Sequence, residues 1–130
     1  MKKGFIGILS FVLFFSISAI QAQCLLIDIP VENKVKDASL IVEGKVVKQQ
    51  SFFNNSHSFI YTAHSIEIKK YFKGQAITDT IIVITEGGKV GTSMVSSYPK
   101  ADIRLNEYGI FMLHMHNLSD FPEQYKNTYQ

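Results

Sequence analysis

The sequence has one cysteine, Cys24, no tryptophan and only three prolines among its 130 residues. A single cysteine allows no internal disulfide, so a disulfide-stapled scaffold is excluded. The chain also lacks an excess of charge. Once Lys2 and Lys3 are assigned to an amino-terminal leader, the 13 basic side chains become 11, and they balance the 11 acidic ones. A net charge of zero leaves no electrostatic footprint for nucleic acid, so we expect no nucleic-acid partner.

The chain is rich in apolar residues. Hydrophobic residues make up 46% of it, aromatic residues 12% and charged residues 18%. This is the composition of a chain that buries a core and not of a disordered tail. About 108 residues remain after the leader, which is enough for one small domain and argues against a two-domain enzyme.

The first 22 residues have the order of a secretory signal peptide. Lys2 and Lys3 precede an apolar stretch, and small and polar residues follow it up to Ala22. We expect cleavage after Ala22 and a secreted or cell-surface protein. The alternative is an uncleaved anchor, because residues 4–20 reach the lower limit of about 17 to 25 residues that span a bilayer. The short stretch and the small residues after it favour cleavage, so no stable membrane span is expected afterwards.

Cys24 lies two residues after the expected cut, which raises a lipoprotein alternative in which its thiol is acylated. The preceding Gln23 argues against this, since lipoprotein signals resemble one another in placing Gly, Ala or Ser there. A free or intermolecularly paired thiol is the other alternative. A metal-chelating cysteine at the amino terminus would require cleavage after Gln23.

Apolar residues alternate with a period of two from residue 38 onward, and Gly, Asn, Asp and Pro separate the groups. Groups rich in Val, Ile, Tyr, Phe and Thr with this period are typical of strands. Strands are predicted over residues 40–48, 59–72, 78–85 and 108–117, with a weaker one in 89–97, a polar loop over 49–58 and one helical turn over 31–37. The third group is nearly continuous in Ile, Val and Thr, which indicates a central strand covered on both faces.

Alternation also predicts which side chains face the core. In the second group the predicted inward residues are Ile60, Thr62, His64, Ile66, Ile68 and Phe72. In the last group they are Phe111, Leu113 and Met115, with Met112, His114 and His116 on the opposite face.

Four or five strands with short connections predict a mainly antiparallel, all-β fold. Curling into a small five-stranded OB-like barrel, closed or partly open, would cover the core and remove the edges. An open sheet that needs a partner is the alternative. The expected organisation is a signal peptide over 1–22 with its signal helix, a lead-in over 23–37, the barrel domain over 38–117, and a tail over 118–130 that looks truncated.

Four segments carry a resemblance to a known family: ASLIVEGKVV (38–47), YTAHSIEIKKYFKG (61–74), ITEGGKVG (84–91) and LNEYGIFML (105–113). Together they resemble the OB-like β-domains of exported bacterial proteins that are similar in pattern to netrin and tissue-inhibitor-of-metalloproteinase (NTR/TIMP-like) modules. The resemblance implies a barrel, export, and occurrence beside peptidase or adhesion modules. Its motifs mark strands and turns, and none places a catalytic group. The cysteine pairs of the eukaryotic inhibitors are absent, so the resemblance does not imply inhibition of a metallopeptidase.

Two histidines are weak candidates for a metal site. His114 and His116 would project from one face of a strand, as two ligands of a divalent metal could. Zinc needs more ligands, and the candidates for a third are His57 and His64. No carboxylate stands at a signature distance, so we predict neither a metal nor another cofactor. The sequence also has no Gly-x-Ser-x-Gly elbow and no paired carboxylates, so we predict that it is not an enzyme.

Aromatic residues give the candidate binding site. Phe52, Phe53, Phe59 and Tyr61 lie in or beside the predicted loop over 49–58. Phe52 and Phe53 cannot easily both pack inward from a polar loop, so one or both are predicted to form a contact patch for a protein or a glycan. The alternative is that these rings plug one end of the barrel.

These features together predict an exported, non-enzymatic β-barrel module that binds an extracellular or cell-surface protein. One alternative is an accessory or prodomain-type module of a larger secreted peptidase or adhesin. The other is a lipid-anchored metal-binding protein.

Overall fold

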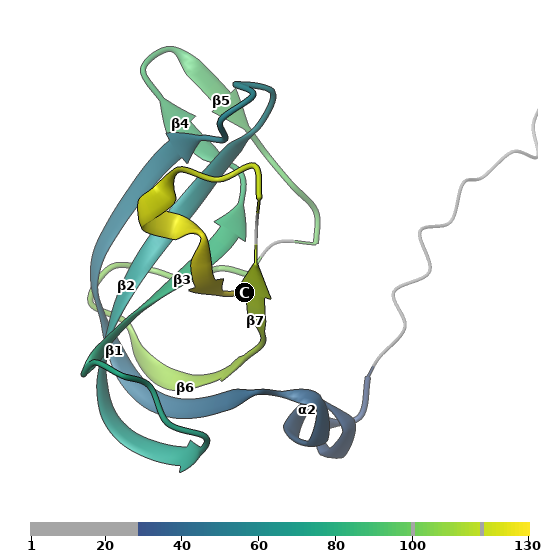
Figure 1. Ribbon diagram of the computed structural model, residues 1–130, viewed down its shortest axis with the longest axis vertical. Coiled ribbons are helices and arrows are strands. Elements are labelled where there is room, and N and C mark those ends of the chain that lie inside the picture. Colours follow the sequence, from purple (N-terminus) through teal and green to yellow (C-terminus); the bar gives the residue numbers. More distant parts are fainter. Residues whose placement is uncertain (1–28, 100, 118) are drawn as a thin grey trace, which may run out of the picture.

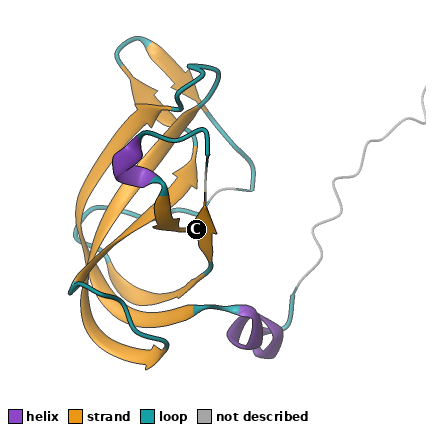
Figure 2. Ribbon diagram, viewed as in Figure 1, coloured by secondary structure: helices purple, strands orange, loops and turns teal. Residues whose placement is uncertain are grey.

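The computed structural model describes residues 29–99, 101–117 and 119–130, and these are mainly β, as the sequence predicts (Figures 1 and 2). In chain order the elements are α2 (Val31–Asp37), β1 (Leu40–Phe53), β2 (Ile60–Lys73), β3 (Thr80–Glu86), β4 (Gly88–Val90), β5 (Ser93–Val95), β6 (Tyr108–Leu113), β7 (Met115–Asn117), the 3-10 helix η1 (Glu123–Tyr125) and β8 (Asn127–Tyr129). The predicted signal peptide, its cleavage site at Ala22 and Cys24 lie outside the described residues. Within those residues, no helix is long and apolar enough to cross a membrane.

Six strands form one sheet in the order β6–β1–β2–β3–β8–β7, and β4 pairs with β5 in a separate hairpin. The pairs are antiparallel except β3 and β8, which run parallel and meet at Val83 and Tyr129. The sheet curls (Figure 1) but is not closed into a barrel, because in the part of the chain that is described β6 pairs with β1 alone. The closed five-stranded form of the expected barrel is therefore corrected to an open, curled sheet.

The curl follows from irregularities in the long β1–β2 pair. Its register shifts at three places in β1, one of them between Glu43 and Gly44. Such bulges bend a strand and increase its twist. A Cβ atom on Gly44 would lie 2.7 Å from the carbonyl oxygen of Glu67, so glycine permits the close approach of the two strands.

Two hydrophobic clusters lie on the two faces of β3. The larger contains Leu40, Val42, Val46, Ile66, Ile81, Val83 and Leu113. The smaller contains Ala63, Ile84, Phe121 and Tyr125, with Phe52, Tyr61 and Ile82 packed against it. Because β3 gives Ile81 and Val83 to one cluster and Ile82 and Ile84 to the other, the prediction of a strand covered on both faces is confirmed.

Two predicted inward residues are exposed. Phe72 is 51% exposed because it lies beyond Glu67, the last residue of β2 that pairs with β3. Met115 is 62% exposed because the predicted strand over 108–117 is interrupted at His114, where the backbone pairs with Gln130 instead of β1. Ile60, His64 and Leu113 are buried as predicted.

The predicted boundaries change at two loops. The polar loop expected over 49–58 is shorter, because β1 stays paired with β2 up to Phe53 and Ile60. The weak strand expected over 89–97 is instead the β4–β5 hairpin, which turns at Gly91 with a φ of 59°. The helical turn over 31–37 is confirmed as α2.

The carboxyl-terminal segment belongs to the folded domain. Phe121, Tyr125 and Thr128 are buried, and β8 lies between β3 and β7. The fold therefore extends past residue 117, where the sequence placed the domain limit. Elements of three residues are too short to produce a visible alternation, so the pattern gave no signal for β8.

Candidate binding site

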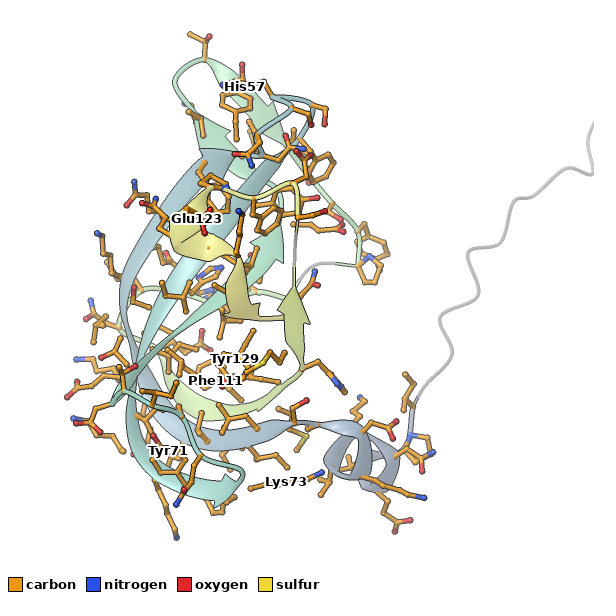
Figure 3. All side chains as sticks on the ribbon, in the orientation of Figure 1. His57, Tyr71, Lys73, Phe111, Glu123 and Tyr129 are labelled. Atoms are coloured by element: carbon orange, nitrogen blue, oxygen red, sulfur yellow. The ribbon has the colours of Figure 1, made fainter. Side chains whose placement is uncertain are left out.

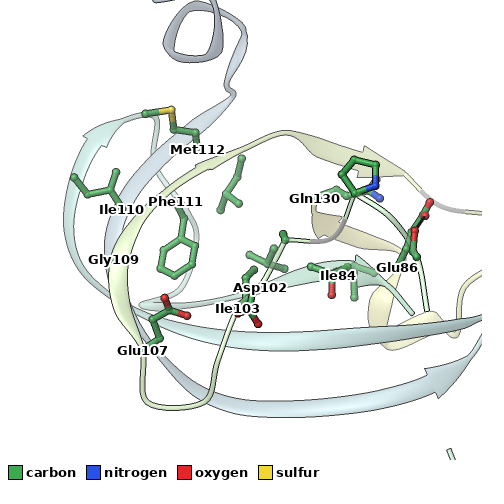
Figure 4. A pocket seen from close by; sticks show the side chains of 16 residues that line it. Ile84, Glu86, Asp102, Ile103, Glu107, Gly109, Ile110, Phe111, Met112 and Gln130 are labelled. Atoms are coloured by element: carbon green, nitrogen blue, oxygen red, sulfur yellow. Dashed lines mark hydrogen bonds between the residues drawn. The ribbon is translucent and has the colours of Figure 1, made fainter. Parts of the chain in front are cut away.

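A pocket of about 530 Å³ lies between β3 and β6 (Figure 4). Its lining comprises Val83, Ile84, Thr85 and Glu86 of β3, Gly109, Ile110, Phe111, Met112 and Leu113 of β6, the loop residues Ser97, Pro99, Ala101, Asp102, Ile103 and Glu107, and Gln130. Pockets for small ligands commonly measure about 300 to 1,000 Å³ and are lined mostly by apolar groups. This pocket has both properties.

The interior of the pocket is apolar. Phe111 points into the curl of the sheet, while Ile110 and Met112 point outward (Figures 3 and 4). Ile103 packs with Phe111 against the larger core cluster. Gly109 shares the inward face of β6 with Phe111, and a Cβ atom there would have no neighbour within 4 Å. The absence of a side chain at Gly109 therefore keeps the pocket open along β6.

Carboxylates surround the mouth of the pocket. Glu86, Asp102 and Glu107 are exposed and line it, and Figure 4 shows Glu86 and Glu107 on opposite sides. Glu86 accepts a hydrogen bond from the hydroxyl of Ser97 at 2.9 Å, and Glu107 accepts one from the backbone N–H of Arg104 at 2.8 Å. These bonds hold the side chains of Glu86 and Glu107 in place.

Asp102 is held by a neighbouring guanidinium. The Nε atom of Arg104 donates to Asp102 Oδ2 at 3.0 Å. This hydrogen bond, and then the attraction of the carboxylate charge, raise the pKa of Arg104. Both side chains are exposed, so the pair orders the loop locally and adds little stability.

Two strand edges border the pocket. The residues of β6 from Tyr108 to Leu113 pair with β1 along one edge, and no described strand pairs with the other. That second edge is used only from His114, whose backbone exchanges two hydrogen bonds with Gln130. On the facing side, β3 is paired with β8 only at Val83. Unpaired strand edges present backbone donors and acceptors to any incoming chain.

A polar network around the buried His64 fixes the loop wall of the pocket to the sheet. Gln49 Nε2 donates to the carbonyl of Ile103 at 2.7 Å and lies 3.0 Å from His64 Nδ1. The two hydrogens of the Gln49 amide serve one contact each, so His64 Nδ1 is the acceptor of the second. In this tautomer His64 Nε2 carries the hydrogen and donates to Thr85 Oγ1 at 2.8 Å. His64, only 3% exposed, is thus a structural anchor.

Three of the four predicted aromatic contact residues lie together, around Phe121 and Tyr125. The ring of Phe52 stacks on Tyr125 with centroids 4.2 Å apart. Tyr61 lies 4.6 Å from Phe121 and 5.0 Å from Phe59. All three rings are half-buried, and Phe52 and Tyr61 pack against the smaller core cluster.

Phe53 is separate from this group. It is half-buried at the end of β1, and its ring stacks on His57 with centroids 5.6 Å apart. Phe52 and Phe53 therefore both belong to a strand and not to the loop in which the sequence placed them. Figure 3 shows His57 at the end of the molecule away from Phe111 and Tyr129.

Of Phe52, Phe59 and Tyr61, Tyr61 carries the titratable group, and burial changes its pKa. The pKa of Tyr61 is raised, first by desolvation and then by the negative charges of Glu86 and Asp120. The phenol therefore stays protonated at neutral pH and behaves as a packing group.

The histidines considered for metal binding are dispersed over the fold. His114 is exposed between β6 and β7, His57 lies in the β1–β2 loop and His64 is buried in β2. The side chain of His116 lies outside what is described. Among the described residues, no three His, Cys, Asp or Glu side chains are grouped to hold a metal ion.

Sequence reasoning missed the pocket. The inward alternation of Phe111 and Leu113 was visible, and Gly109 has the same parity. Nothing in the pattern showed that the second edge of β6 is unpaired. Comparisons with family models, curated proteins and solved structures found no match for this chain. The function is therefore argued from the geometry.

Proposed function

We propose that this chain is an exported, non-enzymatic binding module that holds a protein outside the cell or at the cell surface. The pocket between β3 and β6 supports the proposal: an apolar interior at Phe111 and Ile103, a mouth bearing carboxylates, and strand edges on two sides. Apolar area supplies affinity, and the few polar groups at the mouth supply orientation. The leader in residues 1–22 supports export.

We also infer that the curled sheet is a partly open barrel of the OB-like kind. In support, β6 and β7 are successive segments separated only by His114. One stretch of chain thus meets β1 along β6 and β8 along β7, so the strand order returns to its start. Barrels of this kind bind through loops and an exposed strand face. The proposed NTR/TIMP-like relationship rests on the four sequence segments named above.

The proposal is tested by capture from culture supernatant with immobilised residues 23–130. Gly109→Leu adds a side chain on the pocket face of β6, where the backbone is not left-handed and a Cβ atom would have no neighbour within 4 Å. We expect this variant to lose the captured partner. Thr92→Leu adds the same side chain at the exposed β4–β5 turn and should capture as the unmodified chain does.

A second variant separates the two candidate surfaces. Phe53→Ala removes the ring that lies apart from the core cluster, at the far end of β1. Loss of capture in Phe53→Ala but not in Gly109→Leu would assign binding to the surface around Phe53 and His57 instead of the pocket. Capture of no partner by the unmodified chain would overturn the binding-module proposal.

A further inference from the structure

We propose that protonation of His64 breaks the hydrogen bond from Gln49 to Ile103, and so detaches a segment of the loop before β6 from the sheet. We call this hydrogen bond the tether. The inference goes beyond the proposed function, because it concerns this chain alone and holds whatever the pocket receives. Histidine, with an ordinary pKa of about 6.5, is the side chain that changes its charge between about pH 5 and pH 8.

One atom joins His64 to the loop. Gln49 Nε2 lies 3.0 Å from His64 Nδ1 and 2.7 Å from the carbonyl oxygen of Ile103. A carbonyl oxygen can only accept, so the atom that faces it is the amide nitrogen of Gln49 and not the amide oxygen. The same nitrogen faces Nδ1, and this second contact is a hydrogen bond only while Nδ1 carries no hydrogen. The arrangement therefore requires a neutral ring.

Protonation of the ring would bring two N–H groups face to face. A charged imidazole donates from both nitrogens, and Nε2 already donates to Thr85 Oγ1 at 2.8 Å. The new Nδ1–H would point at the NH2 group of Gln49. Turning the amide over puts Oε1 in front of Nδ1–H, but it also puts Oε1 in front of the carbonyl oxygen of Ile103. Because two acceptors repel each other, the amide can serve the charged ring or Ile103, but not both.

Other hydrogen bonds hold the end of the same loop without His64. The N–H group of Asn106 donates to the carbonyl of Val46 at 2.8 Å, and the N–H group of Val46 donates to the carbonyl of Glu107 at 2.9 Å. These bonds fix residues 106–107 to β1 whatever the charge of the ring. Loss of the tether should therefore loosen residues 101–103, which include pocket-lining Ile103 (Figure 4), without unfolding the domain.

Water can reach the ring although His64 is only 3% exposed. His64 and its hydrogen-bond partners border a second cavity, of about 260 Å³, which the hydroxyl side chains of Ser51 and Thr62 also line. A cavity of this size has room for several water molecules, and its polar groups can form hydrogen bonds with them. A proton can thus enter and leave the site while the domain stays folded.

Charged side chains stand close to the tether on each element that surrounds His64. They are Asp102, Arg104 and Glu107 on the loop, Glu86 on β3, Lys48 on β1, Glu67 and Lys69 on β2, and Lys89 on β4. Carboxylates favour a charged imidazole, whereas ammonium groups and burial oppose it. Their balance sets the pH at which the ring becomes charged. The position of the Gln49 amide sets which contact is then lost.

The first experiment follows the ring and the loop together in residues 23–130, by NMR between about pH 8 and pH 4. Side-chain signals of His64 report its protonation. Exchange of the Ile103 amide, which donates to the carbonyl of Ala101 at 3.1 Å, reports the loop, with each rate divided by that of an unstructured peptide at the same pH. We expect protection of Ile103 to fall by about three- to tenfold as the ring becomes charged, the effect of one lost hydrogen bond. Protection of Asn106 should not change over the same range.

Three results of this titration would overturn the proposal. One is a ring that becomes charged while Ile103 keeps its protection. Another is a ring that stays neutral until the whole domain unfolds. The last is an equal loss at Ile103 and Asn106, because that pattern marks general unfolding in acid and not the release of one tether.

The second experiment replaces the joining amide. Gln49→Glu keeps the size of the side chain and an acceptor for Nδ1–H, but the carboxylate has no hydrogen for the carbonyl of Ile103. At pH 7 this variant should already show the low protection of Ile103 that the unmodified chain reaches only in acid. Gln50→Glu makes the same change at the exposed neighbouring residue and should behave as the unmodified chain does. Full protection of Ile103 in Gln49→Glu would show that Gln49 does not hold the loop.

The third experiment removes the titration. Glutamine offers a donor and an acceptor but does not change its charge, so His64→Gln should abolish the pH response of Ile103. His57→Gln alters an exposed histidine in the β1–β2 loop and should leave the response as it is. A response that persists in His64→Gln would assign it to another group and overturn the proposal.

None of these measurements needs a partner. Failure of the tether to respond to pH would leave the binding-module proposal standing. Absence of capture from culture supernatant would overturn the proposed function and leave the tether standing.

Discussion

The carboxyl-terminal segment meets the sheet at two places, and the two junctions differ sharply. At the β1–β2 loop the side chain of Asn54 donates to Asp120 Oδ2 at 2.6 Å, and Asn55 Nδ2 donates to the carbonyl of Phe121 at 2.9 Å. At β6, the same segment ends its pairing with the two hydrogen bonds between His114 and Gln130. The first junction is closed by polar and aromatic contacts, and the second leaves a strand edge open.

The two junctions differ in how the backbone N–H and C=O groups find hydrogen-bond partners. A loop can satisfy its polar groups with nearby side chains, and Asn54 Oδ1 accepts from the N–H groups of both Ser58 and Phe59 at 2.9 Å. A strand edge pairs with a further strand or with water. Among the described residues β8 contains three residues, and β6 pairs with β1 alone. The first junction is held by side-chain hydrogen bonds, and at the second the outer edge of β6 has no paired strand among the described residues.

The largest effect is expected from breaking the closed junction at Phe121. This ring is 3% exposed and contacts Phe52 and Tyr61. Phe121→Ala leaves a cavity and should lower the free energy of unfolding by about 3 to 5 kcal/mol, measured by urea denaturation. The control Phe72→Ala removes a half-exposed ring and should change it by no more than about 0.5 kcal/mol. Equal losses would show that Phe121 is not a core residue.

A smaller loss is expected from the polar part of the same junction. Asn54 is 5% exposed and joins the loop to Asp120. Asn54→Ala leaves the N–H groups of Ser58 and Phe59 without their acceptor, which should cost about 1 to 3 kcal/mol in the same assay. Asn55→Ala removes one part-buried hydrogen bond of an exposed residue and should cost less. A larger cost for Asn55→Ala would contradict this account of the loop.

The open junction should tolerate change. Gly109→Leu should alter the free energy of unfolding by less than about 1 kcal/mol, because glycine in a strand costs about 0.5 to 1 kcal/mol and the Cβ position has no neighbour within 4 Å. Gly44→Ala on the adjacent strand places a Cβ atom 2.7 Å from the carbonyl oxygen of Glu67 and should destabilise. Thermal denaturation of the two variants compares an open position with a filled one, and a lower Tm for Gly109→Leu than for Gly44→Ala would refute the open pocket.

The smallest effect concerns pH. Burial raises the pKa of Tyr61 above its ordinary value of 10.0, so the folded state favours the neutral phenol. The resulting stabilisation is complete below the pKa of the unfolded chain and is lost as the pH rises through the higher pKa of the folded one. Between about pH 9 and pH 11, Tyr61→Phe should therefore lose less stability than the unmodified chain, as urea midpoints would show. Parallel curves for both proteins would remove Tyr61 as a cause.

The strand-forming regions could be predicted because their apolar side chains recur at every second residue. Alternation located β1, β2, β3 and the β6–β7 stretch, and the continuous Ile, Val and Thr run marked β3 as covered on both faces. The sequence singled out the four aromatic candidates as residues, but it did not show which of them lie together in the structure. The place of Phe52 depends on Phe121 and Tyr125, which lie far along the chain in elements too short to show a period.

The sequence by itself determined a mainly β domain with one helical turn. A two-residue period places apolar side chains on one face of a strand, and this holds whichever strands pair with it. Only the tertiary structure decided which edges are paired, how far the sheet curls and where a pocket remains. Pairing depends on which strands meet in space and on how many residues each contributes. Among the described residues β6 pairs with β1 alone, and the pocket lies between β6 and β3.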